Sequence, residues 1–222
     1  MLRTSASFIS WITHPLLAIT YIYILLLLIN PFDFGFTKWS DPGAVILFIR
    51  IFLTTFFIPA FAVLMLTFIG LAKSIELPEK EDRIAPYIIS GIFYLWMFRN
   101  LLDNPDIPPS FSRAILGASI GLFLAFFINI FDKISAHTVG IGGILGFILV
   151  FLFQHKEAEL LFQGLNDAIY LIPLPLIFLI FVIIAGLVGS SRLYLKAHQP
   201  MQVYGGFIIG IIAQFIALRF VP

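Results

Sequence analysis

Long apolar stretches without charged residues alternate with short polar segments along the whole chain. A helix needs roughly 20 apolar residues to cross about 30 Å of hydrocarbon, and five of the stretches reach that length comfortably. The stretch at 114–131 is close to the limit, and the one at 84–98 is short. The pattern predicts six to seven membrane-spanning helices, over residues 4–32, 51–72, 84–98, 114–131, 134–155, 168–191 and 197–218.

The short stretch at 84–98 is the one whose crossing the pattern leaves open. As a helix it covers about 22 Å, at roughly 1.5 Å per residue. It reaches further if the Arg99 side chain extends toward water and if Leu101 and Leu102 join the helix.

Local signals refine two other stretches. The first is followed by Asn30 and Pro31 with no small-residue cleavage site, so we expect a permanent helix and not a signal peptide. His14, inside this stretch, is interpreted as an interfacial residue. Pro173 and Pro175 are expected to kink the sixth helix, because proline removes a helical hydrogen bond.

Composition supports this interpretation. Hydrophobic residues make up 60% of the 222 positions and charged residues 11%, against roughly 25% charged residues in soluble domains. An ordinary soluble domain and a disordered chain are therefore excluded. A membrane barrel would alternate apolar and polar residues. The sequence thus predicts an all-α integral membrane protein, a bundle of six to seven transmembrane helices in one domain over 1–222.

The charge balance and the absence of cysteine narrow the chemistry. The chain has 13 Lys and Arg against 12 Asp and Glu, a net charge of +1 without a basic block, so nucleic acid is not an expected partner. Without cysteine, disulfides, Cys-ligated zinc and thiol catalysis are excluded. We see no convincing metal-ligand cluster and expect no cofactor. The expected partner is the lipid bilayer, and nothing in the sequence sets the oligomeric state.

Three polar clusters interrupt the apolar pattern, at 79–83, 132–138 and 191–200. Ionisable groups at membrane depth are functional-site candidates by default. If the third and fourth stretches both cross the membrane, or neither does, all three clusters lie on the same face. Three polar loops on one face can form a single site.

These clusters resemble the three signature motifs of the type 2 phosphatidic acid phosphatase (PAP2) superfamily, K-x6-R-P, P-S-G-H and S-R-x5-H-x3-D. The third cluster keeps the spacing from Ser191-Arg192 to His198. The second keeps Ser135 and His137, and the first keeps Arg83. The resemblance covers roughly residues 83–202 and implies a PAP2-like helical fold.

The chain departs from the family pattern in all three motifs. Glu76 stands where the first motif has Lys, so that Lys80 or Lys73 would have to replace it. Ala136 replaces the glycine of the second motif. In the third motif Gln202 replaces the Asp that orients the nucleophilic histidine.

The resemblance implies a role for each retained residue. His198 would attack phosphorus and become phosphohistidine, while His137 would protonate the leaving lipid oxygen and then activate water. Imidazole suits both roles because its ordinary pKa is about 6.5. The phosphoryl oxygens would be held by Arg83, Arg192, Lys80 and the hydroxyl of Ser135. The two guanidinium groups match the geometry of a phosphoryl group. This chemistry requires no metal.

Gln202 raises the main question about activity. Its amide oxygen can accept a hydrogen bond and orient His198, but it carries no negative charge. In a serine-protease triad the acid-to-amide change costs roughly 10⁴ in kcat. We therefore expect either a slow enzyme or one in which another carboxylate substitutes; those nearest the motifs are Asp132, Glu79, Glu81 and Asp82.

The resemblance implies a membrane phosphatase whose partner is a lipid substrate, a lipid phosphate or an isoprenyl (pyro)phosphate. One alternative is a degenerate PAP2-fold protein that binds lipid phosphate or transfers it. Another is a small transporter or structural membrane protein, which requires the polar clusters to lie on different faces. Lys and Arg are divided almost evenly between the two faces, so the positive-inside rule does not decide orientation. The family favours a bacterial inner membrane with the site on the outer face.

Overall fold

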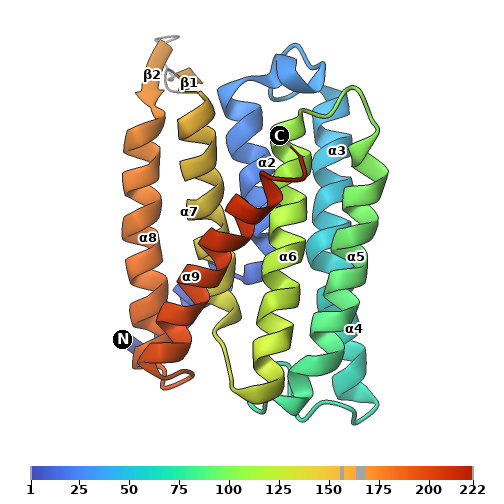
Figure 1. Cartoon of the computed structure of the whole chain (residues 1–222), viewed down its shortest axis with the longest axis vertical. Coiled ribbons are helices and arrows are strands. Elements are labelled where there is room, and N and C mark those ends of the chain that lie inside the picture. Colours follow the sequence, from blue (N-terminus) through green and yellow to red (C-terminus); the bar gives the residue numbers. More distant parts are fainter. Residues whose placement is uncertain (1, 156–157, 164–168, 222) are drawn as a thin grey trace.

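The computed structural model describes residues 2–155, 158–163 and 169–221. Its long helices run up and down side by side, and a short hairpin lies at one end of the bundle (Figure 1). The elements are α1 (Leu2–Ile12), α2 (Ala18–Ile29), α3 (Pro42–Phe52), α4 (Ile58–Phe68), α5 (Ile84–Leu102), α6 (Pro109–Phe131), α7 (Ala136–Gln154), β1 (Glu159–Gln163), β2 (Ile169–Pro173), α8 (Leu174–Tyr194) and α9 (Pro200–Ala217).

Six helical segments of the described residues are long and apolar enough to cross a membrane. The first combines α1 and α2 through a short 3-10 turn, Pro15–Leu17, and the second combines α3 and α4 through a π-helical turn, Leu53–Phe57. The other four are α6, α7, α8 and α9. The prediction of an all-α membrane protein is confirmed.

Helix α5 contains the short third stretch, residues 84–98, and extends beyond it. It runs for 19 residues to Leu102, so Leu101 and Leu102 do join it. At roughly 1.5 Å per residue it is about 28 Å long, and it lies antiparallel to α6 along the height of the bundle (Figure 1). The chain therefore returns after α6 to the end of the bundle at which α5 began.

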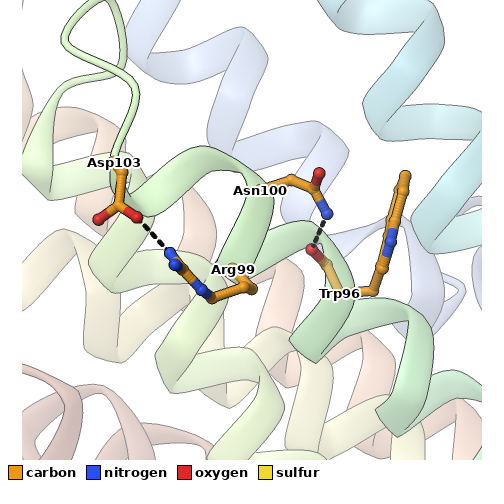
Figure 2. A network of polar contacts seen from close by, with 4 residues as sticks. All are labelled: Trp96, Arg99, Asn100 and Asp103. Carbon is orange, nitrogen blue, oxygen red and sulfur yellow. Dashed lines mark hydrogen bonds and ion pairs between the residues drawn. The ribbon is translucent and has the colours of Figure 1, made fainter.

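The far end of α5 carries an exposed polar network (Figure 2). Arg99 pairs with Asp103 one turn later, and the Asn100 side chain donates to the Trp96 carbonyl oxygen at 2.7 Å. The Arg99 side chain is thus exposed, which is one of the two conditions under which the sequence allowed this stretch to reach further.

The sixth apolar stretch differs from its prediction at its start. Residues Ile169–Pro173 form β2, which pairs antiparallel with β1. The expected proline kink is wrong, because α8 begins only at Leu174, with Pro173 as its N-cap and Pro175 in its first turn. The first turn tolerates proline because its N–H groups have no helical acceptor.

Helices α7 and α9 cross with their backbones in direct contact. A Cβ atom at Gly210 would lie 2.2 Å from the Val139 carbonyl oxygen, and one at Gly142 would lie 2.6 Å from that of Phe207. Figure 1 shows α9 crossing the bundle obliquely over α7. Only glycine fits at such positions, and small residues allow membrane helices to approach this closely.

Substitution at this crossing should destabilise the bundle. Gly210→Ala adds a methyl group against backbone atoms that cannot rotate away, and overpacking of this kind costs about 1–3 kcal/mol. For a chain of this size, each kcal/mol of destabilisation lowers Tm by about 2–4 °C. Gly186→Ala in α8 is the matched control, because its Cβ meets nothing within 4 Å. Thermal unfolding in detergent tests the difference, and equal shifts in the two variants would contradict this packing.

Candidate active site

The three polar clusters lie together at one end of the bundle, at the loops that precede α5, α7 and α9 (Figure 1). Arg83 Nη1 donates to the Ile134 carbonyl oxygen at 3.1 Å, which joins the first cluster to the second. The Ser135 N–H donates to the Gln202 carbonyl oxygen at 3.2 Å, which joins the second to the third. The prediction that they share one face is confirmed.

His198 lies at this end of the bundle, in the loop between α8 and α9. Its side chain is buried, with 8% of the residue exposed. Its Nδ1 atom lies 3.1 Å from Gln202 Oε1, in the first turn of α9. The spacing of four residues thus places Gln202 against the imidazole.

Burial and nearby cations keep this imidazole neutral. Desolvation lowers the pKa of His198 from 6.5 to about 4, and the positive charge of Arg83 adds to this effect. The hydrogen bond to Gln202 opposes the shift, while Arg192 and Lys133 add to it. A buried neutral imidazole facing three cations is suited to an anionic ligand.

The two motif arginines approach His198 from different elements. Arg83, just before α5, donates from Nε to the Leu77 carbonyl oxygen at 2.9 Å, besides its bond to Ile134, and burial lowers its pKa. Arg192, in the last turn of α8, donates from Nη1 to Ser10 Oγ at 3.3 Å. Its buried Nε has no hydrogen-bond partner among the residues that the structure describes. An anion here would supply the missing acceptor.

His137 stands at the start of α7 and contacts the N-terminal segment. Its Nε2 lies 3.1 Å from the Ser10 carbonyl oxygen, and its ring packs edge-on against His14 with centroids 5.8 Å apart. The sequence pattern does not predict Ser10 as a site residue, and it predicts His14 only as an interfacial residue. No local signal links them to the motifs, because 127 residues separate Ser10 from His137.

Two other predicted phosphate ligands make structural contacts. Ser135 is fully buried, and its hydroxyl oxygen caps α7 by accepting from the Thr138 N–H at 3.4 Å. Lys80 Nζ donates to the last carbonyl oxygens of α6, Ile130 at 3.1 Å and Phe131 at 3.3 Å. Contact of either side chain with phosphate stays a prediction.

The described side chains favour acid–base and nucleophilic chemistry. Within residues 2–155, 158–163 and 169–221, no group of three or more His, Asp or Glu side chains could hold a metal ion. Two imidazoles, two guanidinium groups and the helix N-terminus of α7 lie at the same end of the bundle. Such an arrangement can bind a phosphoryl group and attack it with nitrogen.

Comparison with known proteins agrees with the motifs. Residues 127–222 match the family model of the PAP2 superfamily. None of the curated proteins and none of the solved structures gives a match. The matched range includes Arg192 and the two motif histidines, His137 and His198. Arg83, Ser10 and His14 precede it.

The environment of His198 predicts the pH at which its imidazole takes up a proton. Its imidazole should stay neutral at pH 7 and titrate near pH 4. Gln202→Asp places a negative charge against Nδ1, favours the imidazolium form and should raise this pKa. Titrating ¹⁵N-histidine signals by NMR in detergent measures both values, with His198→Asn as the assignment variant. A wild-type value at or above 6.5, or one that Gln202→Asp does not raise, would contradict this description.

Proposed function

We propose that the protein hydrolyses a lipid phosphate or an isoprenyl (pyro)phosphate through a phosphohistidine intermediate. The match of residues 127–222 to the PAP2 superfamily supports a phosphatase in general. The observation that carries this proposal is the environment of His198. A buried neutral imidazole faces Arg83 and Arg192, and Gln202 contacts its Nδ1 atom.

The proposed reaction has two steps. Nε2 of His198 attacks phosphorus in line, the bond to the leaving oxygen breaks, and His137 gives that oxygen a proton. His137 then takes a proton from water, which attacks the phosphohistidine, releases phosphate and restores Nε2. Arg83 and Arg192 bind the equatorial oxygens, whose negative charge must be stabilised throughout.

An apolar cavity beside the site supports a lipid substrate. The cavity has a volume of about 190 Å³ and lies between the start of α2, α7 and α8. Its lining includes Ile12, His14, Tyr21, Ile144, Phe181 and Ile184. His14 also touches His137, so a chain in this cavity would place its head group close to that histidine.

Phosphate release by the purified protein tests the proposal. We expect release from at least one member of a panel of phosphatidic acid, phosphatidylglycerophosphate, isoprenyl phosphates and lipid A phosphate. His198→Ala should reduce release to background, and His137→Ala by about 10²–10⁴, the usual contribution of general acid–base catalysis. His155→Ala is the matched control, because His155 stacks on Phe151 at the other end of α7.

The intermediate gives a second readout. His137→Ala should accumulate acid-labile phosphate on the protein, since it slows hydrolysis of phosphohistidine, and His198→Ala should accumulate none. Lipid phosphate binding without release or labelling would instead favour the degenerate binder, for which the Gln202 replacement is the supporting observation.

We further propose that the site faces the outside of a bacterial inner membrane. The chain has no cysteine, so single cysteines report on sidedness directly. Lys80→Cys, Lys133→Cys and Lys196→Cys should all react with a membrane-impermeant maleimide in intact cells, whereas Lys38→Cys, in the loop before α3, should not. Labelling of Lys38→Cys alone would place the site inside, and labelling that divides the three site variants would favour the transporter or structural alternative.

A further inference from the structure

We propose that Asp132 is a positioning residue for His198 and acts through the side-chain amide of Gln202. The chain would thus replace the single carboxylate of the third motif with a relay from Asp132 through Gln202 to His198. The proposal rests on the proposed function, because it assigns the reactive nitrogen of His198.

The contacts of Gln202 are what carry this inference. Its Oε1 lies 3.1 Å from His198 Nδ1 and accepts the Gln199 backbone N–H at 3.2 Å. Its Nε2 donates to Asp132 Oδ1 at 3.3 Å. The amide oxygen and the amide nitrogen of Gln202 therefore each have a partner other than His198, namely the Gln199 N–H and the Asp132 carboxylate.

These contacts determine which way the amide points. A backbone N–H can only donate, so the amide atom beside Gln199 must be oxygen. A carboxylate can only accept, so the atom beside Asp132 must be nitrogen. A side-chain amide by itself can rotate and exchange these atoms, whereas here the two partners oppose rotation together.

The amide orientation in turn selects the tautomer of His198. Oxygen faces Nδ1, so Nδ1 must carry the proton and Nε2 keeps its lone pair for attack on phosphorus. Rotation of the amide would present an N–H to Nδ1 and move the ring proton to Nε2, which removes the nucleophile. A wrongly held tautomer costs roughly 10⁴ in kcat in a serine-protease triad.

The fold holds Asp132 in place for this role. Asp132 is the C-cap of α6 with an extended backbone, and its Oδ1 also accepts the Lys133 N–H at 2.7 Å. The Ser135 N–H donates to the Gln202 carbonyl oxygen at 3.2 Å and ties the same loop to α9. The negative charge of Asp132 polarises the amide toward His198, since hydrogen bonds in a chain strengthen one another.

No contact of the other candidate carboxylates with Gln202 is found among the described residues, and one oxygen of Asp82 is buried without a hydrogen-bond partner there. Glu79 lies 3.9 Å from Lys73, and Glu81 is exposed at the start of a 3-10 turn. Glu81 therefore provides a matched control for removal of an exposed acid at the same end of the bundle.

A double-mutant cycle with Gln202→Asp tests the relay. Asp132→Ala should lower kcat by about 10–100-fold, the loss typical when a residue that orients a metal-ligating histidine is removed, with KM changed by less than about twofold. In the Gln202→Asp background the same change should cost nothing, because a carboxylate then holds Nδ1–H directly. Glu81→Ala should have no effect in either background. An equal loss in both backgrounds would show a structural role and overturn the proposal.

The tautomer itself is a readout that needs no activity. ¹⁵N NMR of the histidines should show His198 protonated on Nδ1 in the wild type and a mixture of tautomers in Asp132→Ala. A wild type without phosphatase activity would reject the proposed function and leave this measurement valid. A single unchanged tautomer in Asp132→Ala would overturn the relay, whether or not the protein hydrolyses phosphate.

Discussion

Direct backbone contact between α7 and α9 holds together the two loops that carry the second and third motifs. Gly206 and Gly210 allow α9 to lie against the first turns of α7, where a Cβ atom at Gly206 would be only 2.0 Å from Thr138 Oγ1. His137 and Ser135 stand at the start of one helix, and His198 and Gln202 at the start of the other. A larger side chain at the crossing would separate the two motif loops.

The second constraint is electrostatic. The site buries positive charge near His198, and Asp132 is linked to this histidine through the Gln202 amide. Burying a cation without a full set of acceptors costs free energy, and the buried Nε of Arg192 lacks a partner among the described residues. Binding of a phosphoryl group would relieve this cost. In the proposed function, a bound phosphate would supply this missing negative charge, as the electrostatics of phosphoryl transfer require.

Parts of the chain outside the family match complete the site. Arg83 reaches the second motif from the turn before α5, and Ser10 of α1 contacts both Arg192 and His137. The N-terminal segment also lines the apolar cavity, through Ile12 and His14. The matched range thus supplies His137 and His198, while the segments before it supply Arg83, a contact to His137 and part of the wall of the apolar cavity.

The sequence by itself determined the class of the protein and the spacing within each motif. In hydrocarbon, a charge-free stretch of about 20 residues can satisfy its backbone hydrogen bonds only as a helix. The spacing of four residues also keeps Gln202 close to His198 along the chain. The sequence left open whether Leu101 and Leu102 would extend the short third stretch, and the structure shows that they do.

Tertiary structure decided what depends on contacts between distant segments. The prolines at 173 and 175 start α8 instead of kinking it, because the preceding residues pair with β1. Ser10 meets Arg192 across 182 residues, and the choice of Asp132 among the acids near the motifs depends on where the α6–α7 loop meets α9. Sequence spacing fixes neighbours along one helix, whereas partners on different helices are fixed only when those helices pack.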